Sequence, residues 1–182
     1  MDQTRSNQQS TKSARSNHVF AAVHEITGKI ATDQTEFFLL PSSNGNNYLL
    51  IVFDYDSNYI HAEPMKSRSG ANILEAYKQA VIMFIKHGLK PKLQPLVNEA
   101  TAVLKKFITD IGINFQLAPP HAHRRNSVER CIRTCKNHLI ATFSSTDKDF
   151  PLHLWDRMLP QALITLNHLR GSRINPILSA FA

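Results

Sequence analysis

The chain has little cysteine and no long apolar run, and each absence excludes a class of protein. The two cysteines, Cys131 and Cys135, are too few for a disulfide framework and favour a reducing compartment. No segment approaches the roughly 18 apolar residues that a membrane-spanning helix needs. The N-terminal residues are polar, so we expect no signal peptide. We therefore expect an intracellular protein without a membrane partner.

Acidic residues are also scarce relative to basic ones. The 182 residues include 14 Asp and Glu against 21 Lys and Arg, which gives a formal net charge of +7. This excess favours a polyanionic partner, and nucleic acid is favoured over a membrane surface. The first residues, through His18, are almost all polar or basic and cannot bury enough apolar surface to order themselves. We predict a disordered tail or linker over residues 1–24 and one folded domain over residues 25–182.

The first part of that domain predicts an antiparallel meander of three strands. The Asn44-Gly45 pair supplies the positive φ of a hairpin turn, and Ser57-Asn58 supplies the second turn. Pro64 is expected to end the third strand. The three predicted strands have the sequences KIATDQTEFFLL (Lys29–Leu40), YLLIVFDY (Tyr48–Tyr55) and YIHAEPM (Tyr59–Met65).

Helices and short strands alternate in the rest of the domain. Strands are predicted at 92–97 and 113–118, and helices follow Ser69, Glu99, the HAHRRN loop and Pro151. Pro160 is expected to kink or divide the last helix. The order βββ-α-β-α-β-α-α is that of a mixed α/β fold. The inward faces of the first two helices are predicted to be Ile73, Leu74, Tyr77, Val81, Phe84 and Ile85, and Val103, Leu104, Phe107 and Ile108.

Three positions could meet at one edge of the predicted sheet. In a sheet ordered 3-2-1-4-5, Asp33 of the first strand lies beside position 97 at the end of the fourth, and Glu129 projects from the helix over that edge. A triangle of carboxylates can hold two Mg²⁺ ions about 3.5–4 Å apart for in-line attack on a phosphodiester. Position 97 is Val, so the triangle has only two carboxylates.

Five motifs follow one another along the domain: TDQTEFF (32–38), NEA (98–100), PPHAHRRNSVERCIRTCKNH (119–138), LWDRMLPQALITLN (154–167) and NPILSA (175–180). Together they resemble the catalytic core of integrases from retroviruses and LTR retrotransposons. The resemblance spans residues 28–182 and is specific because the motifs occur in the family's order. It implies an α/β, ribonuclease H-like fold with a five-stranded mixed sheet of order 3-2-1-4-5 flanked by helices. It also implies an Asp, Asp, Glu catalytic set, in which Asp33 is the first Asp and Glu129 the Glu.

The chain departs from the family's pattern at two positions. Val97 occupies the place of the second Asp, 64 residues after Asp33 and 32 before Glu129. Val suits a strand but offers no oxygen to a metal, so the fold is expected to survive and the metal site is not. Glu36 stands where the family pattern has Gly. Glu99 could in principle replace the missing carboxylate, but an acid at a helix N-terminus is also favoured by the helix dipole.

Each candidate acid also has a purely structural interpretation. Asp33 could be an ordinary strand-end residue, and Glu129 could be a helix-surface acid paired with Arg125 or Arg133. Asp54 and Asp56 are interpreted as turn formers. A zinc site at His121, His123, Cys131 and Cys135 is disfavoured, because the spacing matches no common zinc motif and both cysteines lie on an apolar helix face. The zinc-binding domain that often precedes integrase cores is not expected in this sequence.

Basic residues around Glu129 are candidates for binding a DNA backbone, with a solvated helix face as the alternative. The set consists of Arg124, Arg125, Arg130, Arg133 and Lys136, to which His121 and His123 could add hydrogen bonds to phosphates.

The leading hypothesis is a retroelement integrase core for metal-dependent DNA cleavage and strand transfer, inactive or weakened by Val97. The alternative is a non-catalytic DNA-binding or dimerising remnant of the same fold. The resemblance implies Mg²⁺ or Mn²⁺ as cofactor, DNA as partner, homo-oligomers and no small-molecule substrate. A protein that acts on host DNA would be nuclear.

Overall fold

The computed structural model describes residues 25–96, 100–117 and 127–182 of the chain. The described part of the chain contains a three-stranded antiparallel sheet of order β1-β2-β3, formed by β1 (Ile30–Gln34), β2 (Tyr48–Asp54) and β3 (Ile60–Met65). A parallel pair, β4 (Leu93–Leu96) and β5 (Asn114–Leu117), lies beside it. The predicted tail over residues 1–24 lies outside the described residues.

The expected continuous five-stranded sheet is present as these two sheets, which an isolated parallel bridge between Lys29 and Leu93 connects. The bridge places β4 beside the start of β1, with both strands running in the same direction.

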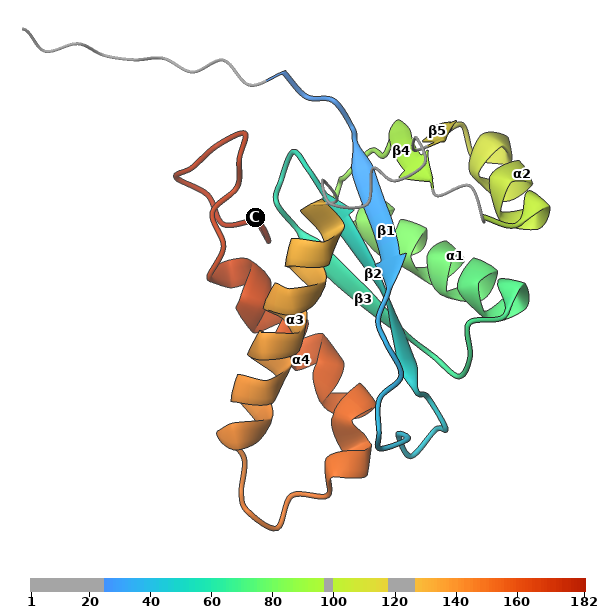
Figure 1. The fold of residues 1–182 in the computed structure, drawn as a ribbon. Coiled ribbons are helices and arrows are strands. Elements are labelled where there is room, and N and C mark those ends of the chain that lie inside the picture. Colours follow the sequence, from blue (N-terminus) through green and yellow to red (C-terminus); the bar gives the residue numbers. More distant parts are fainter. Residues whose placement is uncertain (1–24, 97–99, 118–126) are drawn as a thin grey trace, which may run out of the picture.

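Helices cover both faces of the three-stranded sheet, as Figure 1 shows. On one face lie α1 (Gly70–Lys86) and α2 (Ala102–Asp110), which share an apolar cluster with Ile30, Leu50 and Val52. On the other face lie α3 (Ser127–Ser144) and α4 (Trp155–His168), which pack on Ala31, Leu49, Ile51 and Phe53. Adjacent residues of a strand point to opposite faces, so a continuous apolar run such as β2 fits a strand that is buried on both sides.

Capping residues mark the starts of two helices close to where the sequence predicts them. The hydroxyl oxygens of Ser69 and Thr101 accept hydrogen bonds from the backbone N–H groups of Asn72 and Leu104, respectively. The second helix therefore begins at Ala102 and not at Glu99, which lies outside the described residues. Ile85 and Val103 were expected to face inward, but they are 64% and 63% exposed.

The first strand is shorter than predicted and ends at Gln34. The Thr35 hydroxyl accepts the hydrogen bond of the Leu49 N–H at 2.9 Å, and the Thr35 carbonyl accepts one from Arg68 Nη2 at 2.5 Å. Because Arg68 occupies this carbonyl and a side chain receives the Leu49 N–H, Thr35 and Leu49 keep only the bond from the Thr35 N–H to the Leu49 carbonyl, and the regular ladder ends there.

Two prolines lie inside elements that continue past them, so the prediction that Pro64 ends the third strand was wrong. β3 continues through Pro64 to Met65, which an edge strand tolerates because one of its sides forms no ladder. Pro160 lies inside α4 without dividing it; a short 3-10 helix (Leu152–Leu154) precedes α4.

A side chain of α4 covers part of the open side of β3. Asn167 Oδ1 accepts a hydrogen bond from the Ile60 N–H at 2.9 Å, and Asn167 Nδ2 donates one to the Ile60 carbonyl at 2.8 Å. Asn167 is fully buried and also donates to the Leu163 carbonyl, so its amide is held between α4 and the strand.

Candidate functional site

Asp33 lies near the end of β1, opposite Ile51 of β2. Strand alternation places it on the same face as Ala31, which packs in the α3 and α4 cluster. The side chain is half-buried, and its Oδ1 accepts a hydrogen bond from the Gln34 N–H at 2.8 Å. The strand therefore presents a carboxylate at the position where the sequence predicted one.

Asp33 lines a cavity of about 260 Å³, called here the Asp33 cavity. The last residue of β4, Leu96, and Ala100 line the same cavity, and these two residues flank the undescribed positions 97–99. Lys29 and Leu93 are bridged in parallel, and Asp33 and position 97 each lie four residues beyond this pair. The remaining lining residues are Thr32, Gln34, Leu50, Arg68, Gly70, Ile73, Tyr77, Thr101 and Leu104.

A buried chain of hydrogen bonds holds β4 against β1 at this point. Gln94 of β4 is fully buried, and its Nε2 donates to Thr32 Oγ1 at 2.7 Å. Its Oε1 accepts a hydrogen bond from the hydroxyl of Tyr77 on α1. Burial raises the pKa of Tyr77, so this hydroxyl remains a donor. The chain joins three elements and fixes the edge of the sheet beside Asp33.

Sequence reasoning did not identify Gln94 as a positioning residue. A signal was available, because Gln94 lies inside an otherwise apolar strand, and a buried polar side chain needs a hydrogen-bonding partner. The sequence alone does not identify that partner, because Tyr77 is distant from Gln94 in the chain.

Glu129 lies in the first turn of α3 and is exposed. It lines a second cavity of about 450 Å³, called here the Glu129 cavity. Gln34 lines both cavities, whereas Asp33 and Glu129 each line only one of them. The other lining residues are Thr35, Glu36, Ile132, Arg133, Lys136, Asn137 and Ile140.

Two of the predicted DNA-contacting cations, Arg133 and Lys136, line the Glu129 cavity. Lys136 Nζ lies 3.7 Å from Glu36 Oε2, so the acid that replaces the family's Gly partly neutralises this lysine. Arg130 is exposed on α3 and does not line the cavity. The other predicted contacts, His121, His123, Arg124 and Arg125, lie outside the described residues.

The turn interpretation is confirmed for Asp54, whereas Asp56 lies in the same turn but its carboxylate binds residues before β1. Asp54 is buried, and its Oδ2 accepts hydrogen bonds from the Ser57 N–H at 2.7 Å and the Ser57 hydroxyl at 2.6 Å. Burial raises the pKa of Asp54 in spite of these bonds. Asp56 accepts from the Gly28 N–H at 2.6 Å and from Thr27 Oγ1 at 2.9 Å. Both carboxylates stabilise the chain around the end of β2.

Cys131 and Cys135 lie buried on the apolar face of α3. Burial raises the pKa of the Cys131 thiol, and burial raises the pKa of the Cys135 thiol to about 12. Zinc binds thiolates, so both side chains are poor zinc ligands in this position.

The carboxylates that the structure describes do not fit two Mg²⁺ ions. Within residues 25–96, 100–117 and 127–182, no group of three or more His, Cys, Asp or Glu side chains could hold a metal ion. The side chain of Val97 contains no oxygen, and Asp33 and Glu129 line separate cavities. Two carboxylates leave two divalent ions short of both charge and ligands.

No helix in the described part of the chain is long and apolar enough to cross a membrane.

No protein-family model matches the chain, and no curated protein matches it in sequence. Solved structures do match. A chain of the simian T-cell lymphotropic virus intasome in complex with PP2A regulatory subunit B56 gamma is similar at 20% identity with a TM-score of 0.68. That match covers 90% of this chain, which spans only 56% of the intasome chain.

Isolated core domains also match over nearly their whole length. The HTLV-2 integrase catalytic core domain in complex with magnesium, in its trimeric form, has 18% identity and a TM-score of 0.63, covering 84% of this chain and 93% of that domain. The catalytic core domain of BIV integrase has 15% identity and a TM-score of 0.60, covering 85% and 91% respectively. The chain therefore has the α/β fold of a retroviral integrase catalytic core.

Proposed function

We propose that the chain is an integrase-type catalytic core of an LTR retroelement that binds DNA and has lost efficient metal-dependent cleavage and strand transfer. One observation carries the proposal. In a fold of the integrase type, Asp33 shares a cavity with Leu96 and Ala100, which flank the segment that contains Val97. A second carboxylate is needed beside Asp33 for two-metal chemistry, and the sequence supplies an isopropyl group there.

The proposed DNA surface is the helix that carries Glu129. Arg133 and Lys136 line the Glu129 cavity, and cationic side chains at this spacing on one helix face can follow a phosphate backbone. Arg124, Arg125, Arg130, His121 and His123 extend the proposed surface in the sequence. Glu36 reduces the positive charge at this cavity, which supports DNA binding weaker than the family's pattern implies.

The decisive experiment compares the purified chain with its Val97→Asp variant in an oligonucleotide cleavage and strand-transfer assay with Mg²⁺ or Mn²⁺. We expect background activity from the unaltered chain and a gain of about two orders of magnitude from the variant, since a restored metal ligand contributes several kcal/mol to the transition state. A Val97→Asp, Asp33→Asn double variant is the control and should return to background. Metal-dependent activity in the unaltered chain would overturn the inactivation proposal.

The second candidate is a non-catalytic DNA-binding or dimerising remnant. The lack of a metal-holding group in the described residues favours it. It predicts that Val97→Asp yields no activity while the chain still binds duplex DNA. Sedimentation of the same samples measures whether the chain associates with itself. Action on host DNA would place the protein in the nucleus.

A further inference from the structure

Four cationic side chains lie around the end of β2 and the start of α3, and none of them lines the Glu129 cavity. They come from three parts of the chain: the residue before β1, the first turn of α3 and the segment after α4. Arg130, Arg170 and Arg173 all exert their charge on the Cys131 thiol, where they oppose the effect of burial on its pKa. We call Lys29, Arg130, Arg170 and Arg173 the Arg173 patch.

The segment after α4 is anchored in a way that fixes Arg173. Its two ends pair at an isolated bridge between Gly171 and Ser179, and the Ile174 N–H donates to the Asp56 carbonyl at 3.2 Å. Arg170 Nε donates to the Asn58 carbonyl at 3.0 Å. Arg170 therefore holds the segment against the β2–β3 turn.

Two cations of the patch, Arg173 and Lys29, lie over aromatic rings. The Arg173 guanidinium lies over the Phe53 ring, 5.3 Å from its centroid, and 5.9 Å from the Tyr55 centroid. Lys29 Nζ lies over the Tyr55 ring at 4.7 Å. Arg173 is exposed and Tyr55 half-buried, so the rings hold the charges at the surface and do not bury them.

The nearby carboxylates are already engaged elsewhere. Asp54 is buried and bonded to Ser57, while Asp56 receives the Gly28 N–H and the Thr27 hydroxyl. Among the described residues, the ion pairs join His61 to Glu63, Lys78 to Glu75 and Lys136 to Glu36, so none includes a member of the patch. Burial, foremost, and the neighbouring charge of Arg173 lower the pKa of Arg170, as expected where like charges meet. The patch thus holds cations close together without bound carboxylates.

We propose that the Arg173 patch binds the phosphodiester backbone of a nucleic acid as a second contact surface beside the Glu129 cavity. Guanidinium groups suit phosphate because their planar fork can donate two hydrogen bonds to it. Arg130, which extends the proposed α3 surface, is also a member of the patch, so the first turn of α3 links the two surfaces. One strand can pass over that turn and contact both. The inference rests on the proposed DNA-binding function.

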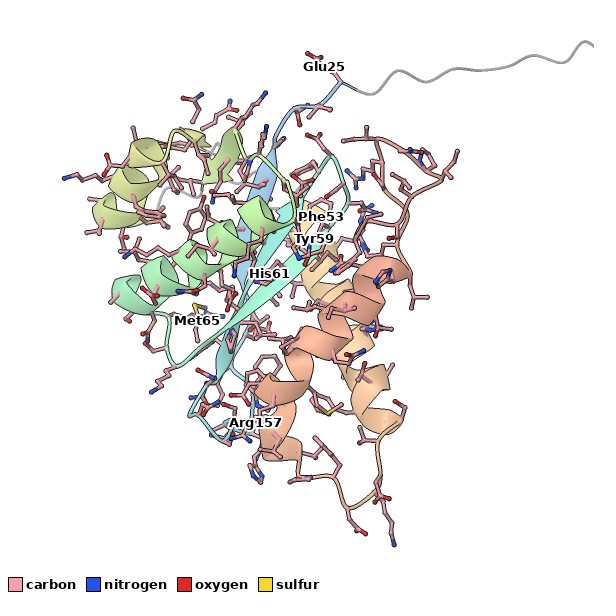
Figure 2. The ribbon with its side chains drawn as sticks, turned by 180° about the vertical axis from the view of Figure 1, so that it is seen from behind. Glu25, Phe53, Tyr59, His61, Met65 and Arg157 are labelled. Atoms are coloured by element: carbon pink, nitrogen blue, oxygen red, sulfur yellow. The ribbon has the colours of Figure 1, made fainter. Side chains whose placement is uncertain are left out.

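The test measures binding of a fluorescent 20-base-pair duplex by anisotropy over a range of salt concentrations. The variant is Lys29→Ala, Arg173→Ala, and the matched control is Lys148→Ala, Arg157→Ala, which removes the same charge from exposed residues elsewhere. Figure 2 shows Arg157 well below Phe53, the ring under Arg173. An Arg133→Ala, Lys136→Ala variant tests the α3 surface separately.

We expect the patch variant to lose at least about fivefold in affinity and to reduce the salt slope by roughly 0.9 per lost phosphate contact, while the control stays near the parent protein. Arg173→Lys should retain most of the affinity that Arg173→Gln loses, which separates charge from the packing of Arg173 on Phe53.

Two outcomes would overturn the proposal and are distinguishable from each other. If the parent binds duplex and the α3 variant weakens it, but the patch variant matches the control, the patch inference alone fails. If the parent does not bind DNA at all, the proposed function fails with it. Binding of the parent to phosphatidylserine vesicles through the patch, without DNA binding, would also count against the nucleic-acid assignment.

Discussion

The sheet edge beside Asp33 and the helix that carries Glu129 are held in place by different means. On the α1 and α2 face, a buried polar chain through Tyr77, Gln94 and Thr32 ties β4 to β1. On the α3 and α4 face, apolar side chains and thiols fill the interface, and charges such as Glu129 lie at its rim. The edge beside Asp33 is therefore specified by directional hydrogen bonds, whereas Glu129 is placed by the packing of a helix.

This difference explains how, under the proposed function, the sheet edge beside Asp33 can persist without a carboxylate at position 97. Hydrogen bonds in the Tyr77 chain hold β4 whether position 97 is Asp or Val, because none of the three side chains involved is a candidate metal ligand. The proposed loss of a carboxylate at position 97 therefore leaves the hydrogen bonds of the sheet edge satisfied.

The largest predicted effect concerns the reactivity of a cysteine thiol on the α3 and α4 face. Burial raises the pKa of Cys135 from 9.0 to about 12, which lowers its thiolate fraction near neutral pH roughly a thousandfold. In a Cys131→Ala background, we expect labelling of Cys135 by Ellman's reagent to be slower by about that factor in the folded protein than in urea. Fast labelling of the folded chain would show that the α3 face is open to water.

Next in size is the effect of removing Gln94 from the α1 face. Gln94→Ala leaves the Tyr77 and Thr32 hydroxyls without this partner and creates a cavity. We therefore expect the free energy of unfolding, measured in urea, to fall by about 3 kcal/mol. Gln79→Ala, at an exposed position of α1, is the matched control and should change stability by less than about 0.5 kcal/mol. Equal effects of both changes would mean that the polar chain does not hold β4.

A smaller effect is expected at the rim of the α3 face. Glu36→Gln removes the acid 3.7 Å from Lys136 and frees that lysine, so duplex DNA affinity should rise about threefold at low salt. Glu75→Gln is the control, because Glu75 also pairs with a lysine, Lys78 at 4.0 Å, on the other face. A similar gain from both variants would reflect net charge alone.

The smallest predicted effect is a pH dependence at the end of the α1 face. Burial, foremost, and the charge of His61 lower the pKa of His87, which packs against Tyr59 and Phe181. The unfolded chain therefore binds this proton more readily, and stability should fall as pH drops below about 6.5. His87→Gln should flatten the difference between urea unfolding at pH 7.5 and at pH 5.5, whereas the exposed His153→Gln should not.

The sequence predicted local structure better than long-range contacts. Ser69, Gly88 and Gly112 mark helix ends through backbone chemistry that depends only on neighbours, and the observed helices agree. The end of β1 was not predictable, because it depends on Arg68 reaching the Thr35 carbonyl. The length of β3 depends on its place at the sheet edge, which Pro64 alone does not reveal.

In the candidate site, too, local features were predicted better than long-range contacts. Motif order placed Asp33 in the first strand and Glu129 on the helix after the fifth strand, and the structure has them in β1 and α3. The pairing of Glu36 with Lys136 joins residues 100 positions apart, and no local pattern indicates such a contact. The same holds for the convergence of Arg170 and Arg173 with Lys29. The assignments of metal-binding and DNA-binding roles remain predictions.

The amide of Asn167 has a consequence for how copies of this chain meet. The Tyr59 and Met65 carbonyls accept hydrogen bonds from β2, so strand alternation turns Ile60 and Pro64 toward the open side of β3. Asn167 satisfies both backbone groups of Ile60, and Pro64 has no N–H to offer. An incoming strand therefore finds few free backbone partners at Ile60 and Pro64, which disfavours edge-to-edge pairing through β3.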